Sequence, residues 1–158
     1  MTGALKADLK RLERLVEIRQ TCVDVAESRV KLAEAEVRRL RAAEEEISGK
    51  IQDTQAAIAY LQSATAGDVQ NRENYIRALE HHRGLIRLSL ETATATLEER
   101  RDEWREAMRQ HKIVAKLRER RLHQWVRQAD VAQQKSQDDA TVARYVRTRL
   151  DSKPKGVP

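Results

Sequence analysis

Apolar residues recur at alternating steps of four and three along the first sixty residues of the chain. Fourteen of the seventeen positions in this series are apolar, whereas a hydrophobic content of 40% would place about seven there by chance. A 3.5-residue repeat keeps one stripe facing a partner helix only when the helices supercoil, so the pattern predicts a left-handed coiled coil. The positions are Leu5, Leu9, Leu12, Val16, Arg19, Val23, Ala26, Val30, Ala33, Val37, Leu40, Glu44, Ile47, Ile51, Thr54, Ile58 and Leu61.

A second, less regular stripe follows between residues 76 and 132. The steps on either side of Trp104 are both four residues long, which makes a stutter in the heptad pattern. A stutter locally unwinds a supercoil, so we expect the coil to straighten near residues 100–108. The positions are Ile76, Leu79, Arg83, Ile86, Leu90, Ala93, Leu97, Arg100, Trp104, Met108, His111, Ala115, Arg118, Leu122, Trp125, Ala129 and Ala132.

The turn signals between the two stripes lie in residues 65–72. Gly67 suits the left-handed C′ position that ends many helices, and Asp68 or Asn71 suits the N-cap of a following helix. No proline interrupts the chain before Pro154, so no other helix breaker is present. The expected fold is therefore all-α, with two long helices forming an antiparallel coiled-coil hairpin.

The expected boundaries follow from that single turn. The first helix covers about residues 4–64, the second about residues 73–150, and both belong to one domain over residues 1–153. Residues 154–158 form a flexible tail.

The position of the turn also predicts the register. With its centre near Asp68, Leu5 lies opposite about residue 131 and Val23 opposite about residue 113. Residues 132–150 then extend past the hairpin as an unpaired helix.

Charge is distributed unevenly along the chain. Residues 1–64 carry 11 basic and 11 acidic side chains, residues 65–97 carry 4 of each, and residues 98–158 carry 16 basic and 10 acidic ones. The whole net charge of +6 therefore comes from the C-terminal segment. This distribution indicates that the C-terminal segment meets an acidic surface.

The sequence contains no arrangement typical of an active site or a metal centre. His81 and His82 are adjacent and point about 100° apart on a helix, so they cannot chelate one ion as an i,i+4 pair would. His111 falls in the seam, and no glutamate stands three residues before any histidine. We expect no enzyme activity, no catalytic residues, no metal and no cofactor.

Neither cysteine content nor hydropathy points to secretion or to a membrane. Cys22 is the single cysteine, which excludes an intramolecular disulfide and favours a reducing cytoplasm. No segment approaches the ~20 uninterrupted apolar residues of a membrane span, and the N-terminus lacks a signal-peptide hydrophobic region. We expect a cytoplasmic protein without direct membrane insertion.

A run of basic residues between positions 100 and 121 leaves three interpretations open. It is a solvated helical face with local ion pairs, a surface for a protein partner, or a contact to nucleic-acid phosphates. Aromatic residues make up only 3% of the chain and acidic residues interrupt the run, so we expect no DNA partner. The run comprises Arg100, Arg101, Arg105, Arg109, Lys112, Lys116, Arg118, Arg120 and Arg121.

Five blocks of sequence, in this order and spacing, resemble one family. They are the LxxLxxxR pattern of residues 12–19, the alanine-rich residues 25–35, the NYIRAL block of residues 74–79, the KLRERR block of residues 116–121 and the QQKSQDDA block of residues 133–140. Together they resemble the flagellar export protein FliJ and its injectisome counterpart YscO (SctO). The resemblance covers nearly the whole chain.

The resemblance implies a stalk in a type III secretion apparatus, flagellar or injectisome. Members of this family look like the coiled-coil rotor of F-type ATP synthases. Their paired termini enter the pore of a hexameric secretion ATPase, which they stimulate or couple to export. Their turn end reaches toward a membrane-embedded export gate, and they are linked to the escort of secretion chaperones. The implied location is the cytoplasmic face of the inner-membrane export apparatus.

By position, the resemblance also assigns contact residues. The overhang after Ala132 lies deepest in the pore, and the gate-contacting block contains Tyr75, Ile76 and Leu79. The expected ring contacts, including three arginines added because of their charge, are Leu9, Leu12, Val16, Arg118, Arg120, Arg121, Leu122 and Trp125, with Ala129 at the same end. The competing hypothesis is a generic coiled-coil scaffold or chaperone that oligomerises through its hairpins, and a less favoured one is a nucleic-acid-binding rod.

Overall fold

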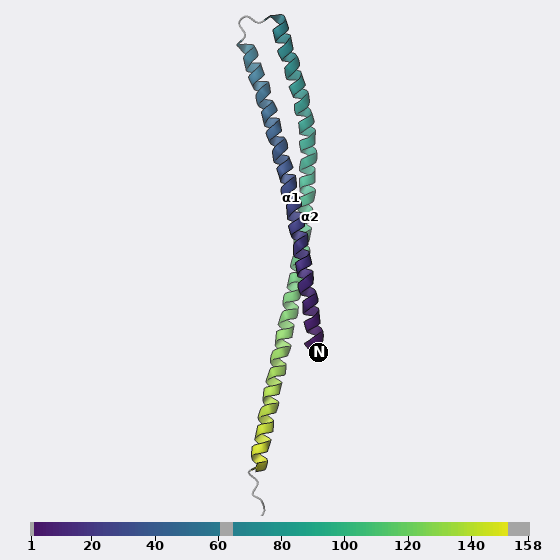
Figure 1. Ribbon diagram of the computed structural model, residues 1–158, viewed down its shortest axis with the longest axis vertical. Coiled ribbons are helices and arrows are strands. Elements are labelled where there is room, and N and C mark those ends of the chain that lie inside the picture. The colour runs from purple at the N-terminus through teal and green to yellow at the C-terminus, as the bar shows by residue number, and fades with distance from the viewer. Residues whose placement is uncertain (1, 61–64, 152–158) are drawn as a thin grey trace, which may run out of the picture. The chain divides into compact units, whose positions relative to one another are not determined.

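The computed structural model describes residues 2–60 and 65–151, and these residues form two α-helices. Helix α1 covers Thr2–Ala59 and helix α2 covers Ala66–Asp151 (Figure 1). The described part of the chain contains no strand. The two helices pack against each other as a helical hairpin, which confirms the predicted all-α fold.

The chain divides into two compact units. We call residues 21–109 the turn unit, and residues 1–20 together with 110–158 the terminal unit. Each unit contains one segment of α1 and one segment of α2.

Cross-helix ion pairs establish the antiparallel direction within the turn unit. In the turn unit, Arg87 Nε bonds Glu44 Oε1 at 2.6 Å across 43 residues of sequence, and Arg101 Nη2 bonds Glu34 Oε1 at 3.1 Å across 67 residues. The later residue of α2 thus pairs with the earlier residue of α1. In the terminal unit, the matching bond joins Arg118 to Glu13 at 3.3 Å across 105 residues.

The predicted stripe of α1 forms the core of both units. Each of its positions from Leu5 to Ile58 is buried or half-buried, and Leu61 lies outside the described residues. Even the polar members Arg19, Glu44 and Thr54 are half-buried. The most deeply buried members, with 4% to 8% of their surface exposed, are Leu9, Val23, Ala26, Val37, Leu40, Ile47 and Ile51.

The stripe of α2 agrees with prediction as far as Trp104 and then broadens. Val114 is the most buried described residue after that point, at 8% exposure, although the predicted stripe places Ala115 in the seam instead. Ala115 is half-buried, so two adjacent rows of side chains on α2, one through Val114 and one through Ala115, lie at the seam there. Past the stutter, the predicted seam positions Leu122 and Ala132 are exposed.

The predicted turn boundaries need correction, because Thr65 starts α2 seven residues earlier than expected. The backbone N–H of Asp68 donates to Thr65 Oγ1 at 3.3 Å, and the backbone N–H of Thr65 donates to Asp68 Oδ2 at 3.1 Å. This reciprocal pair is a capping box with aspartate in the place of the usual glutamate. Gly67 lies inside α2 and has no positive φ, so its assignment as a helix C′ residue was wrong.

The cross-helix ion pairs agree with the predicted register only in part, since Arg101 and Glu34 fit it to within about one residue. The predicted register, with Val23 opposite about residue 113, places Arg29 opposite about residue 107. Arg29 Nη1 instead lies 3.8 Å from Glu103 Oε2, about one helical turn closer to the start of α2. The expected end of the first helix near residue 64 and the expected tail at residues 154–158 lie outside the described residues.

The cap yields a first prediction. Thr65→Ala should lower the free energy of unfolding by about 1 kcal/mol, because it removes the side chain that receives the Asp68 N–H. Thr92→Ala is the matched control, since the Thr92 hydroxyl donates to the Leu88 carbonyl in the middle of α2 and caps nothing. Thermal unfolding followed by circular dichroism measures both, and equal melting points for the two variants would contradict the capping role.

The same cap predicts a pH dependence. The side-chain hydrogen bond from Thr65, followed by its backbone N–H, lowers the pKa of the Asp68 carboxyl below its ordinary value. A lowered folded pKa means that the stabilisation is present above the ordinary pKa and is lost as pH falls through the folded one. The melting difference between wild type and Thr65→Ala should therefore shrink in acid, whereas a difference that grows in acid would contradict this.

The core yields another prediction. Leu40 is 8% exposed, so Leu40→Asp should destabilise the protein by roughly 3 kcal/mol by placing a carboxylate in the seam. Leu88 is 63% exposed on α2, and Leu88→Asp should change stability by less than about 0.5 kcal/mol. Denaturant titration of the two variants tests this, and similar midpoints would remove Leu40 from the core.

Candidate functional site

The predicted ring contacts on α1 are seam residues. Leu9 is buried, and Leu12 and Val16 are half-buried in the terminal unit. Their apolar surface is used for packing within the hairpin. They support the end of the hairpin, and little of their surface is available to a partner.

The predicted ring contacts on α2 are more accessible. Leu122 is exposed, whereas Trp125 and Ala129 are half-buried. The three arginines of this group differ from one another. Arg118 is held by Glu13 of α1 at 3.3 Å, and Arg121 Nη1 donates to Gln124 Oε1 at 3.2 Å. Arg120 is exposed and has no polar partner among the described residues.

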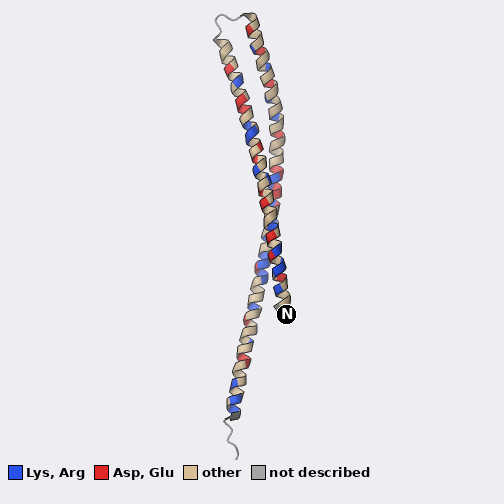
Figure 2. Cartoon of the chain, viewed as in Figure 1, with Lys and Arg blue, Asp and Glu red and all other residues tan. Residues whose placement is uncertain are grey.

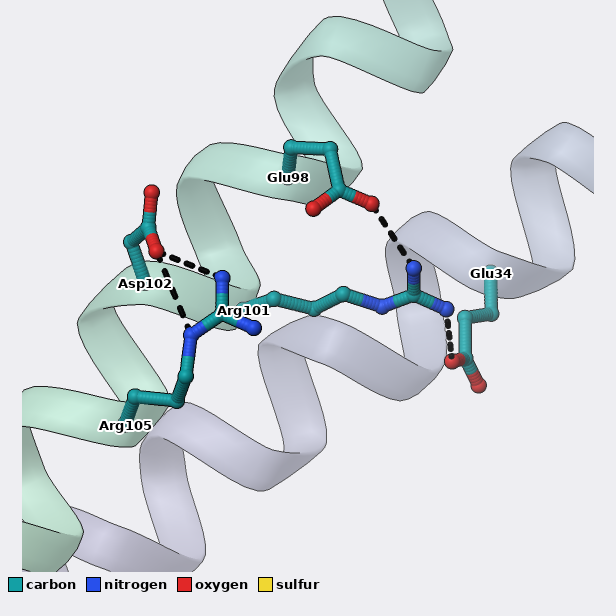
Figure 3. A network of polar contacts seen from close by, with 5 residues as sticks. All are labelled: Glu34, Glu98, Arg101, Asp102 and Arg105. Atoms are coloured by element: carbon teal, nitrogen blue, oxygen red, sulfur yellow. Dashed lines mark hydrogen bonds and ion pairs between the residues drawn. The ribbon is translucent and has the colours of Figure 1, made fainter.

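The basic run divides into a paired part and an unpaired part. Its first four members all bond carboxylates of α2 or α1: Arg100 with Glu103, Arg101 with Glu98 and Glu34, Arg105 with Asp102, and Arg109 with Glu106. Figure 3 shows Arg101 reaching from α2 to Glu34 while it also holds Glu98. Both carboxylates raise the pKa of Arg101, Glu34 most strongly. These cations are neutralised within the hairpin, as the ion-pair interpretation of the run predicts.

Three cations of the run that make no ion pair form a stripe that was not predicted from the sequence. Lys112, Lys116 and Arg120 are exposed, follow one another at i,i+4 spacing, and make no ion pair with any described residue. Residues four apart lie on one face of a helix, so this basic stripe presents three cations in one direction. Part of the signal was in the sequence, because no carboxylate stands three or four residues from Lys112 or Arg120, although Glu119 stands three residues after Lys116. Figure 2 shows that acidic and basic residues alternate closely on other parts of both helices.

The last twenty described side chains form the most exposed segment of the structure. Every side chain from residue 130 to residue 149 is exposed, as expected for the unpaired extension of α2. We call residues 130–149 the terminal arm. Val142, Tyr145 and Val146 are large apolar side chains on one side of this arm, and the guanidinium of Arg149 lies 5.9 Å from the centroid of the Tyr145 ring. These residues lie in the predicted unpaired extension and could have been identified from that position, but they were not predicted as contacts.

The predicted gate contacts are also divided between seam and surface. Ile76 and Leu79 are half-buried in the seam of the turn unit, whereas Tyr75 is 50% exposed. Tyr60, which follows the end of α1, is 85% exposed. Tyr75 is therefore the accessible member of the predicted group.

No group of three or more histidine, cysteine or carboxylate side chains among the described residues is arranged to hold a metal ion. Neither helix contains a stretch that is long and apolar enough to cross a membrane, as far as the structure describes them.

Comparison with known protein families agrees with this arrangement. The family model described as "Flagellar FliJ protein" matches residues 9–150, which includes nearly the whole chain. The chain belongs to the FliJ family. FliJ proteins are stalk components of flagellar and type III export, a structural family that associates with the export ATPase and the export apparatus in the cytoplasm. No curated protein and no solved structure matches the chain significantly.

Proposed function

We propose that this FliJ-family protein is the central stalk of a hexameric type III secretion ATPase. In this proposal the terminal unit enters the pore of the ring, stimulates the ATPase and couples it to export. The turn end points to the export gate, and the same hairpin handles secretion chaperones. The protein acts at the cytoplasmic face of the inner-membrane export apparatus and carries out no chemistry of its own.

The observation that carries the proposal is the terminal arm. Val142, Tyr145, Val146 and Arg149 follow one another at i,i+3,i+4,i+7 spacing, which is the pattern of a helix that buries one face in a groove. Val142, Tyr145 and Val146 are exposed, so most of their apolar surface is available to another protein. A ring that closes around the arm would bury this apolar side against the wall of its pore.

The basic stripe adds an electrostatic contribution to the same end of the chain. Lys112, Lys116 and Arg120 lie in the terminal unit and are not neutralised internally. Unpaired cations attract a ring lumen that carries acidic side chains, and they increase the rate of association. The attraction weakens as salt shortens the Debye length from ~10 Å at 0.1 M to ~3 Å at 1 M.

The gate contact depends mainly on Tyr75. Its exposed ring lies near the start of α2, and it is accessible without disturbing the seam. Ile76 and Leu79 support its position from within the seam. Aromatic side chains of this kind are frequent anchors in protein interfaces because they bury a large area at low entropic cost.

Charge reversal in the basic stripe tests the ring contact. Lys116→Glu combined with Arg120→Glu should abolish stimulation of the cognate ATPase at low salt, because it turns attraction to the ring into repulsion. This variant is cleaner than one that includes Arg118, whose reversal would also set two carboxylates together at Glu13. Arg38→Glu combined with Arg41→Glu is the matched control, since both arginines are exposed and unpaired within the described residues of the turn unit.

Steady-state ATP hydrolysis with purified components gives the readout. The control variant should stimulate the ATPase as wild type does. Full stimulation by the stripe variant at low salt would contradict the electrostatic contact.

A variant of the gate surface tests the other end. Tyr75→Ala should impair export of secretion substrates while leaving ATPase stimulation and helicity intact, because Tyr75 lies outside the seam. Tyr60→Ala is the control for loss of a nearby exposed tyrosine. Secretion assays in cells with each variant provide the measurement, and normal export with Tyr75→Ala would remove this residue from the gate contact.

A further inference from the structure

One face of α2 in the terminal unit is exposed along its whole length, and we call it the outer stripe. Its positions follow one another at steps of three and four residues that average about 3.7, close to the period of a straight helix and longer than a heptad repeat. The outer stripe is therefore a straight surface rather than a second heptad seam. Its members, all exposed, are Ile113, Leu117, Arg120, Gln124, Gln128, Val131, Lys135, Asp139, Val142 and Val146.

Helix α1 does not cover the outer stripe within the part of the chain that the structure describes. Val114 and Arg118, each one residue further along α2, face α1 instead: Val114 is only 8% exposed, and Arg118 bonds Glu13. Ile113 and Leu117 are 60% and 44% exposed. The seam and the outer stripe thus use neighbouring but different faces of α2.

Apolar residues occupy both ends of the outer stripe. Ile113 and Leu117 form the end beside α1, and Val142 and Val146 form the end on the terminal arm, where they are 61% and 48% exposed. Because α2 is continuous between the two ends, neither end can fold onto the other within one chain. Both ends therefore stay exposed to water in a single copy.

The charges inside these apolar ends are opposite in sign. Arg120 stands three residues after Leu117, and Asp139 stands three residues before Val142. Neither Arg120 nor Asp139 makes an ion pair with any described residue. Turned end for end, the outer stripe therefore places an unpaired arginine over an unpaired aspartate while it also places apolar residues over apolar ones.

We propose that the outer stripe binds the outer stripe of a second copy of this chain in a weak antiparallel dimer. The two-fold axis lies midway between Gln128 and Val131, so each contact is made twice. The terminal arm of each copy then packs beside the hairpin of the other. The opposed pairs are Ile113 with Val146, Leu117 with Val142, Arg120 with Asp139, Gln124 with Lys135, and Gln128 with Val131.

The order of the charges determines the direction of the two copies. A parallel dimer would set Arg120, Lys135 and Asp139 each against its own counterpart. The antiparallel dimer sets Arg120 against Asp139, and it sets Lys135 against the neutral amide of Gln124. No like charges are opposed along the outer stripe, and complementary charges favour this register over others.

The dimer covers the terminal arm when no ring is bound. Val142 and Val146 lie in both contacts, so the dimer and the ATPase ring compete for the same surface. This competition rests on the proposed function, whereas the dimer itself depends only on the outer stripe.

Sedimentation equilibrium of the purified protein over a range of concentrations tests the dimer. Wild type should show a reversible monomer–dimer equilibrium, and Arg120→Asp or Asp139→Arg should each raise the dimer dissociation constant at least about tenfold by opposing like charges. Arg38→Asp is the matched control, because Arg38 is also exposed and without an ion pair among the described residues but lies on α1. Its dissociation constant should stay within about twofold of wild type.

Mixing the two charge variants tests the register. In a heterodimer of Arg120→Asp with Asp139→Arg, both charged contacts again join an aspartate and an arginine. The equimolar mixture should therefore dimerise at least about tenfold more tightly than either variant alone. Circular dichroism should show unchanged helicity in both variants, since neither residue is buried.

Three outcomes would overturn the dimer. One is a wild-type protein that stays monomeric at the highest soluble concentration, and the second is a mixture that associates no better than its components. The third is a wild-type monomer that binds only the purified ATPase, which would assign the outer stripe to the ring alone. Because sedimentation is measured without ATPase, failure of the dimer leaves the proposed stalk function to its own tests.

Discussion

The 4,3 seam between α1 and α2 is the interaction on which the other features of this protein depend. It buries leucine, valine, isoleucine and alanine at a 3.5-residue spacing, and none of the described large side chains is buried anywhere else. Because two helices bury only one stripe each, most of the surface of both remains exposed. Function in such a chain has to come from the flanks and ends of the hairpin, since the seam leaves no room for an enclosed active site.

The seam also explains which charged residues are available to partners. Arginines that flank the seam of the turn unit lie within reach of carboxylates on the same or the facing helix, and Arg87 and Arg101 bond Glu44 and Glu34 directly. Lys112 and Lys116 make no ion pair with any described residue, although Glu119 stands three residues after Lys116. Three of the nine cations of the basic run, in a short stripe, are therefore left without an ion pair inside the hairpin.

Heptad spacing was sufficient to predict the fold and the buried face of α1, because a stripe that long has only one way to be buried. The start of α2 and its buried face near Val114 depended on interactions between residues close together in the sequence. Gly67 suggested a helix end, but Thr65 and Asp68 can satisfy each other's backbone N–H groups, and this cap moves the start of α2 ahead of the glycine. Val114 is more deeply buried than Ala115, the predicted seam residue, because a stutter lets two adjacent rows of side chains on α2 lie at the seam.

The candidate site was predictable only in part. Resemblance to FliJ indicated which ends of the chain to propose as contacts, and the overhang of α2 followed from the position of the turn. Individual contact residues did not follow, because a seam residue such as Leu9 and an exposed residue such as Arg120 look equally suitable in a sequence. Separating them requires knowledge of which face of each helix the partner helix covers.

The central claim is that the terminal arm lies inside the ATPase ring, and site-specific photo-cross-linking tests it most directly. A photo-reactive amino acid at position 146 in the purified stalk should cross-link to the cognate hexameric ATPase, and the same group at position 75 should not. Cross-linking from position 75 without cross-linking from position 146 would contradict the account and would place the opposite end of the hairpin in the ring.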